Sequence, residues 1–426
     1  MAEQLYFSRD TKMYLEFDGY IWEIPVLDGF SFSQATNSSE ITLNEMESAA
    51  GVSRRGRRAF NDSLAPGEWS FSTYVRPFTA AGASQGTGSA DSAAEVHAVE
   101  EVLWALMAGA NNYASAKYDK GGNDVLVPGS SNMTVNFSQS NVSTLSTFNL
   151  YFVLGNANRT VMKLDGCVVG EASIDFDIDG IATIAWSGNC ANLLDFSGSV
   201  HTDNTLPIHS DATADTTAIA IGDVWLDAND GHRLYVMTNV SDGSEAATAY
   251  VNEAITNTTN FIRNRLTVLT VTPTSQDPDN DSSNELEASY NLTLTGGNVT
   301  ISNNITFITP EELGIVNVPI GHVTGTRNVS GSFTCYLTED TGAGVTNVSR
   351  DFFEDLRAIT NVVTNSFALV FKIGGASGTG LELNMATAHV EIPTHSIEDV
   401  ISLETNFQAL PSTIVGTDEL ALTYRP

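Results

Sequence analysis

The stretch Ala172–Leu194 constrains the fold of this chain more than any other. Apolar and polar residues alternate on both sides of Asp179-Gly180, a pattern typical of two β-strands joined by a tight turn. A three-residue connection, Asp179–Ile181, would put the large apolar side chains on one face. The pairs that it sets opposite one another are Ile178 and Ala182, Phe176 and Ile184, and Ile174 and Trp186. The sequence therefore predicts a hairpin with one apolar face and with Asp175 and Asp177 facing water.

Composition places this hairpin in a β-rich globular protein. The chain has 426 residues, of which 42% are hydrophobic and only 16% charged. It is long enough for two or three domains with cores of their own. The net charge of −32 repels the phosphates of nucleic acids and of anionic membranes, so ordinary DNA binding is disfavoured. No stretch has the pattern of a signal peptide or the length of an apolar membrane span, and we expect no membrane contact.

Two amphipathic segments predict one helix in each half of the chain. The first is Asp91–Ala108, with Gly109 placed to end it, and the second is Arg350–Thr360. The first is predicted to turn inward the apolar residues Val96, Val99, Leu103 and Leu106, and the second Phe352, Phe353, Leu356 and Ile359. Most of the rest predicts strands, except for Glu47–Glu68, which is polar and Gly-rich and predicts a long exposed loop.

Short strings recur in the same order in the two halves. Ser70–Val75 recurs as Ser332–Leu337, Phe148–Phe152 as Phe367–Phe371, and Ile184–Leu193 as Ile401–Leu410. Together with the second helix these matches predict an internal duplication. We therefore predict a first domain over 1–196, a linker or insertion over 197–258, and a second domain over 259–426.

Candidate chemical sites are weak in this sequence. Gly82–Gly86 matches G-x-S-x-G but lacks the strand and helix of a nucleophile elbow, and a flexible linker is favoured. His97 and Glu101 lie one helical turn apart without a further ligand, which favours a solvated helix face. The Asp175, Asp177, Asp179 series imitates a calcium loop but has Trp186 where a bidentate Glu is needed. We predict no catalytic residue, no metal and no cofactor.

The three cysteines, Cys167, Cys190 and Cys335, are an odd number without metal-ligand spacing. The hairpin register above sets Cys190 opposite Gly170, three residues from Cys167, which is too far for a disulfide. Buried thiols are the prediction.

The basic cluster Arg54, Arg55, Arg57 and Arg58 is unusual in so acidic a chain. A protease-sensitive loop and a nucleic-acid contact are both conceivable, although the remaining charge opposes the second. We favour docking onto an acidic surface of an identical subunit, because complementary charge selects partner and register.

With the duplication in view, the chain resembles the tail-tube (major tail) proteins of tailed bacteriophages. The resemblance rests on the early short strands followed by a long polar loop, on the single helix of each copy, and on the hairpin string IDFDIDGIATIAWSG. It implies a mainly β fold with one helix per copy, in two tandem tail-tube-type β-sandwich or barrel domains. It also implies sheets that join between subunits into an inner barrel, and rings that stack into a hollow tube.

For a duplicated chain the resemblance implies trimeric, pseudo-hexameric rings in a virion tail assembled in the host cytoplasm. The implied partners are the protein itself, the tail terminator, tip and tape-measure proteins, and double-stranded DNA that passes through an acidic lumen without specific binding. Arg54, Arg55, Arg57 and Arg58 become candidates for contacts between rings, and Asp175 and Asp177 for lumen-facing residues. An extracellular or virion-surface β-sandwich adhesin or decoration protein is the alternative, and a hydrolase is the third choice.

Overall fold

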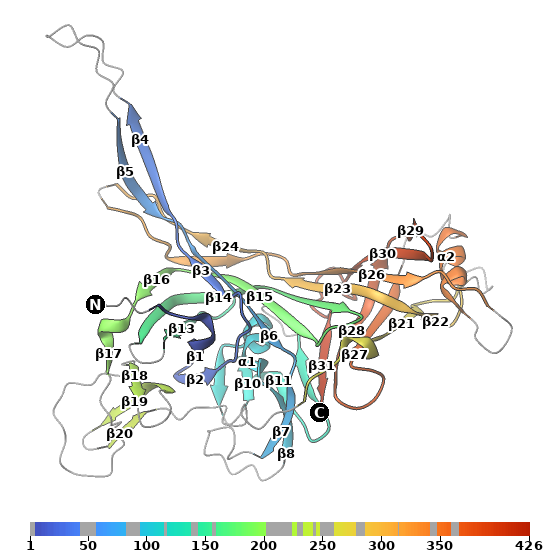
Figure 1. Cartoon of the computed structure of the whole chain (residues 1–426), viewed down its shortest axis with the longest axis horizontal. Helices are drawn as coiled ribbons and strands as arrows, with labels where there is room; N and C mark the ends of the chain where they lie inside the picture. The colour runs from blue at the N-terminus through green and yellow to red at the C-terminus, as the bar shows by residue number, and fades with distance from the viewer. Residues whose placement is uncertain are drawn as a thin grey trace, which may run out of the picture.

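The computed structural model of the chain is mainly β (Figure 1). It describes residues 5–42, 57–81, 94–114, 117–137, 144–155, 159–201, 224–227, 233–241, 244–247, 260–277, 286–313, 315–340, 347–358 and 366–426. Within these ranges there are two α-helices, α1 (Glu101–Met107) and α2 (Ser349–Ala358). Short 3-10 turns occur at Ser8–Asp10, Ser197–Ser199 and Asn264–Leu266. The mainly β fold is confirmed, whereas the duplication and the three domain boundaries stay predictions.

Eight neighbouring antiparallel strands of a larger continuous sheet, here called the main sheet, cross both halves of the chain. Its order is β3 (Ser31–Ser33), β6 (Gly67–Tyr74), β15 (Thr183–Cys190), β14 (Thr160–Asp177), β23 (Leu294–Ser302), β26 (Asn328–Tyr336), β30 (Ile401–Ala409) and β29 (Thr394–Ile397). The first four strands come from the first half and the other four from the second. The halves join where Glu171–Asp177 of β14 pairs with Gly296–Ser302 of β23.

A second layer of strands packs its apolar side chains against those of the main sheet. In the first half it contains β2 (Tyr20–Glu23), β1 (Lys12–Phe17), β13 (Phe148–Leu154), the start of β14, and β16 (Asn192–Asp195). A further series is β9 (Asn112–Ala114), β10 (Lys117–Lys120), β11 (Asn123–Pro128), β12 (Met133–Asn136), β31 (Ala421–Arg425), β28 (Gly380–Val390), β27 (Phe367–Ile373), β21 (Val268–Pro273) and β22 (Tyr290–Leu292). The pairing of β12 with β31 joins the halves a second time.

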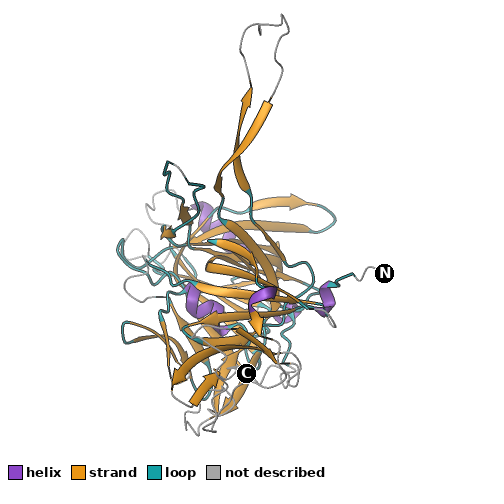
Figure 2. Ribbon diagram, turned by 90° about the vertical axis from the view of Figure 1, so that its left-hand side faces the viewer, coloured by secondary structure: helices purple, strands orange, loops and turns teal. Residues whose placement is uncertain are grey.

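Two β-hairpins, here called the first and second arms, leave the same end of the main sheet. The first arm is β4 (Thr36–Thr42) with β5 (Arg57–Leu64), and it projects far from the body (Figures 1 and 2). The second arm is β24 (Ile305–Ile308) with β25 (Gly321–Thr324). The two arms touch, because Asn317 accepts a backbone hydrogen bond from Leu64 at 2.8 Å. The prediction of a loop over Glu47–Glu68 was therefore wrong for the part described: residues 57–64 form an exposed strand, since β4 supplies its hydrogen bonds.

The region between the halves contains a small sheet of its own. Its strands are β17 (Val200–His201), β18 (Val224–Asp227), β19 (Arg233–Ser241) and β20 (Ser244–Ala247). Val224, Leu234 and Val236 form a separate apolar cluster with Tyr14 and Tyr151 of the first half. This sheet thus lies against strands β1 and β13, away from the main sheet.

The hairpin of β14 and β15 keeps its predicted faces but not its predicted register. Ile174 pairs with Ile184 and Asp175 with Thr183, two residues from the expected alignment, so the turn is longer. A shift of two preserves the faces: Ile174, Phe176, Ile184 and Trp186 are all buried. The turn is longer because another segment pairs with it. Ala182 donates to the carbonyl of Ile262, and Asn264 donates to that of Gly180.

This register also corrects the expected spacing of two cysteines. Val168 lies opposite Asn189, which brings Cys190 beside Cys167 rather than opposite Gly170. Cys167, Cys190 and Cys335 are all buried free thiols, as predicted. Burial and the neighbouring Cys190 sulfur raise the pKa of Cys167 well above its ordinary value, which keeps this thiol protonated.

The first helix is shorter than predicted. Of the expected segment Asp91–Ala108, residues 91–93 lie outside the described part, and Ala94–Ala98 is a strand, β8, paired with β7 (Pro77–Ala81). Helix α1 begins only at Glu101 and ends before Gly109, whose φ of +96° suits glycine. Tertiary pairing outweighed helical periodicity here, because β7 offers the segment a full set of strand hydrogen bonds. The second helix is confirmed over Ser349–Ala358, with Phe352 and Leu356 buried; Ile359 lies outside the described residues.

A buried polar chain ties helix α1 to the C-terminal strand. Trp104 Nε1 donates to the Tyr424 hydroxyl at 2.7 Å, and Tyr424 donates to Glu100 Oε1 at 2.6 Å. Glu100 is fully buried, and this burial raises the pKa of its carboxyl from 4.5 to about 7. The contact links residues more than 300 positions apart, so it fastens the two halves together.

Glu100→Gln is expected to flatten the dependence of stability on pH. A raised folded-state pKa gives stability that is complete below pH 4.5 and is lost as the pH rises through 7. The difference corresponds to about 3 kcal/mol between pH 4 and pH 8, as an order of magnitude. Urea unfolding of both proteins across this range measures it. Equal slopes for Glu100→Gln and the parent chain would contradict the assignment.

Candidate assembly surfaces

One face of the main sheet, here called the open face, is polar and carries no basic residue. Its strands contain no Lys or Arg in β3, β6, β15, the paired part of β14, β23, β26, β30 or β29. Side chains on the other face are apolar and buried, including Trp69, Ile174, Trp186, Phe333 and Phe407. The exposed charges that point away from this core are Glu68, Glu171, Asp175, Asp177 and Glu404. The open face is therefore a hydroxyl- and amide-rich surface with purely negative charge.

Asp175 and Asp177 lie on this open face, as the sequence predicted. Both are exposed, and they alternate with the buried Ile174 and Phe176 along β14. They stand beside Asn298 and Gly296 of the second half. The two carboxylates thus lie at the junction of the halves, near the middle of the main sheet.

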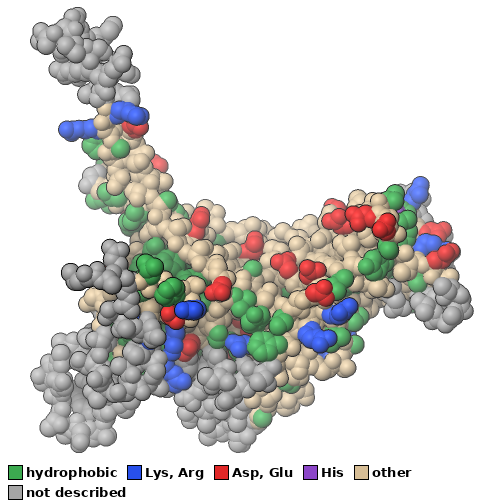
Figure 3. All heavy atoms as spheres, viewed as in Figure 1, with side chains coloured by type: hydrophobic (Ala, Val, Ile, Leu, Met, Phe, Trp, Pro, Cys, Tyr) green, Lys and Arg blue, Asp and Glu red, His purple; other side chains and the backbone are tan. Residues whose placement is uncertain are grey.

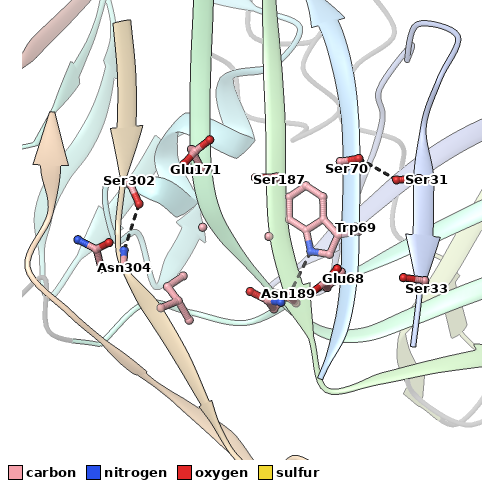
Figure 4. Close-up of a pocket in the computed structure, with 13 residues that line it drawn as sticks. Ser31, Ser33, Glu68, Trp69, Ser70, Glu171, Ser187, Asn189, Ser302 and Asn304 are labelled. Atoms are coloured by element: carbon pink, nitrogen blue, oxygen red, sulfur yellow. Dashed lines mark hydrogen bonds between the residues drawn. The ribbon is translucent and has the colours of Figure 1, made fainter. Parts of the chain in front are cut away.

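A shallow hollow of about 450 Å³ opens on the same face near the base of the arms (Figure 4). Figure 4 shows Glu68 and Glu171 at its rim. The Trp69 ring, buried on the other face of the sheet, reaches the hollow beside Gly188, and its Nε1 donates to the Asn189 carbonyl at 3.2 Å. Ser31 and Ser70 are hydrogen-bonded at 2.8 Å on the far side. Most of its lining residues are small or polar, with Trp69 and Ile305 as the large apolar ones. Gly170 and Gly188 face each other there, and a methyl group on Gly188 would meet the Val168 carbonyl oxygen. The hollow adds serine hydroxyls but no basic group to the open face.

The two outer strands of the main sheet each have one strand partner within the described residues. β3 pairs with β6, and β29 pairs with β30. All four residues of β29 are exposed, as are Ser31 and Ser33 of β3. Unpaired strand edges expose backbone donors and acceptors and are ready to pair with another chain.

The basic cluster is carried by the first arm. Arg57 and Arg58 are exposed on β5, and Arg57 forms an ion pair with Glu40 across the arm at 3.0 Å. Arg54 and Arg55 lie outside the described residues. In Figure 3 basic side chains stand out on the first arm, whereas acidic side chains gather at the opposite end of the molecule, over β29 and β30.

His97 and Glu101 correct a sequence prediction, since they are not on a solvated face. Both are buried, and His97 Nδ1 lies 2.9 Å from Glu101 Oε2. Burial lowers the pKa of His97, but the Glu101 carboxylate outweighs it and raises that pKa overall. Tyr118 also donates to Glu101, at 3.3 Å. The pair is an enclosed structural contact, and no group of three or more potential metal ligands occurs among the described residues.

Other sequence candidates have no described structure. The G-x-S-x-G string at 82–86 lies outside the described residues.

Within the part of the chain that is described, no helix is long and apolar enough to cross a membrane.

Sequence reasoning missed the two exposed strand edges and the exposed apolar residues of the second arm. The second arm has a signal that could have been used: Leu313, Ile315, Val316, Val318 and Ile320 are apolar residues between two short strands, and all are exposed. The strand edges have no such signal, because pairing partners are set by tertiary structure.

Comparison with known proteins agrees with this architecture. No protein-family model matches the chain. The chain is 28% identical over 400 residues to the tail tube protein pb6 of Escherichia phage T5, covering 93% of this chain and 69% of that protein. The similarity runs through both halves and the region between them. The chain is therefore similar over nearly its whole length to a tail tube protein of a bacteriophage.

Proposed function

We propose that the protein is a structural, non-enzymatic subunit of a phage tail tube, located in the tail of the virion, and that it closes into trimeric, pseudo-hexameric rings. The similarity to a tail tube protein supports the first statement. The main sheet supports the second. It already contains one junction between two sets of four strands, one from each half, where β14 pairs with β23, and it leaves one strand edge open at each side.

Ring closure would repeat this internal junction between chains. The edge of β29 on one subunit would pair with β3 on the next, in the way that β14 pairs with β23 inside the chain. Closing the sheet on itself removes both exposed edges, which is the usual remedy for aggregation-prone strands. Closed cyclic symmetry is also the common outcome for self-complementary chains.

The open face would then line the lumen. A wall of carboxylates and hydroxyls without any cation repels the phosphates of double-stranded DNA, so DNA passes without specific binding. The large negative charge of the chain gains a role in this arrangement. Tail terminator, tip and tape-measure proteins are the further partners we propose, with assembly in the host cytoplasm.

The first arm would reach from one ring to the next, with Arg54, Arg55, Arg57 and Arg58 in contact with acidic groups there. Complementary charges at such a contact set the orientation of the rings more than the affinity. The arm is suited to this role because it projects from one end of the main sheet (Figure 1).

Electron microscopy of the purified protein tests the proposal. We expect hollow tubes, or rings with three-fold symmetry. A monodisperse monomer at high concentration would contradict it. Six-fold rings built from six chains would contradict the trimeric stoichiometry but not the proposed formation of a tube.

Asp175→Lys with Asp177→Lys is expected to slow DNA exit from assembled virions. The exchange reverses two charges per chain on the open face, and cations there attract phosphates. Asp165→Lys with Asp195→Lys is the control. Asp165 lies on the first part of β14 and Asp195 on β16, and both strand segments belong to the second layer. Release of DNA after triggering, followed by a fluorescent dye, is the measurement. Identical release kinetics in both double variants would refute the lumen position.

A further inference from the structure

The end of the main sheet opposite the arms is defined by strand direction. β6 leaves the first arm at Gly67, which pairs with Cys190, and reaches Tyr74, which pairs with Thr183. The turn between β14 and β15 therefore lies at the far end. In the second half, β26 runs from Asn328 to Tyr336, which pairs with Ser402. The turn between β29 and β30 lies at that same far end (Figure 1).

The two far-end turns differ in how well they are covered. The turn between β14 and β15 is bonded to Ile262 and Asn264, and Asp179 lies 3.9 Å from Arg265. The turn between β29 and β30, residues 397–401, is exposed throughout. Ile397 is 79% exposed and Val400 58% exposed, and between them stand Glu398 and Asp399. Exposed apolar side chains gathered in one place mark an interaction surface.

The arm end carries the complement of this surface. The loop of the second arm exposes Ile315 (61%) and Ile320 (70%), and the first arm exposes Arg57 and Arg58. Asn317 holds the arms together, accepting from Leu64 and donating to the Asp62 carbonyl at 3.2 Å. The arm end thus presents apolar groups and the exposed Arg58, together with the Arg57–Glu40 ion pair and the exposed Glu311 and Glu312. The far-end turn presents apolar and acidic groups only.

We propose that the turn at residues 397–401 is the surface on which the paired arms of a second copy of this chain dock. Ile397 and Val400 receive the apolar loop of the second arm, while Glu398 and Asp399 face the arginines of the first. A contact between two different ends of identical chains is heterologous, and it repeats without closing, which is how a stack grows. The inference rests on the proposed stacking of rings and names the receiving surface.

The test uses the full chain and separates apolar from charged contributions. Ile397→Ser with Val400→Ser removes the apolar part of the turn. Val127→Ser is the control, because Val127 is an exposed apolar residue on β11 of the second layer. We expect the first variant to form rings but tubes at least about tenfold shorter, since buried apolar anchors dominate interfaces. The control should keep parental tube length.

Charge reversal is the second part of the test. Glu398→Lys with Asp399→Lys, and separately Arg57→Glu with Arg58→Glu, should each shorten tubes, and the combination of all four changes should restore much of the length. Circular dichroism and electron microscopy report folding, rings and tube length. Parental tube length in both far-end variants overturns this inference alone. A parental chain that forms neither rings nor tubes overturns the proposed function and this inference together.

Discussion

Of the two substitutions His395→Pro and Ser396→Pro in β29, we expect one to abolish ring formation while the monomer stays folded. Successive residues of a strand direct their backbone N–H groups to opposite sides, so of His395 and Ser396 one points toward β30 and the other toward the open edge. Proline removes the N–H and blocks approach of a partner strand. Each junction between subunits in a ring contains one β29 edge, so the substitution weakens every junction of the ring.

The experiment compares His395→Pro and Ser396→Pro with His395→Ala and Ser396→Ala. The alanine variants lose the exposed side chains but keep the backbone donors, and they should form rings in parental yield. Mass measurements in solution count the subunits, and near-ultraviolet circular dichroism reports the core. Rings in parental yield from both proline variants would show that β29 is not the closing edge.

Trp104→Ala is expected to cause the largest loss of stability among substitutions of single side chains in the core. Trp104 is fully buried, packs edge-on against Trp186 at 4.7 Å between ring centroids, and donates to Tyr424. Removing a buried Trp side chain costs about 3–5 kcal/mol through lost burial and the cavity left behind. The substitution also removes the indole N–H that donates to the Tyr424 hydroxyl, the group that in turn donates to Glu100.

Urea unfolding measures this loss, with Leu266→Ala as the control because Leu266 is half-exposed. The control should stay within about 0.5 kcal/mol of the parent, as surface substitutions do. Trp104→Phe should fall between the two, since it keeps an aromatic ring but removes the indole N–H. A free energy of unfolding for Trp104→Ala within about 1 kcal/mol of the parent would refute the central role of this side chain.

The local sequence pattern was sufficient to predict which face of a strand is buried. Alternation along Ile174–Asp177 predicted which side chains are buried and which face water, because the two-residue period of a strand fixes this without knowledge of the partner. Gly109 predicted the end of the first helix for a similarly local reason, its left-handed φ. The second helix followed from the spacing of Phe352 and Leu356.

Long-range pairing could not be predicted in this way. The turn after β14 is longer than its sequence suggests because Ile262 and Asn264, some 80 residues away, take up its backbone groups. Residues 94–98 form a strand because β7 pairs with them, although their apolar spacing also suits a helix. His97 and Glu101 are enclosed because other elements pack over them, which no spacing within their own segment records.

The sequence by itself therefore determined a β-rich, acidic chain with a hairpin whose carboxylates face away from the core. Only the tertiary structure decided that β14 pairs with β23, which makes one main sheet out of two halves and leaves β3 and β29 at its edges. The physical reason is that side-chain periodicity acts within a strand, whereas edge pairing depends on which backbone groups meet in space.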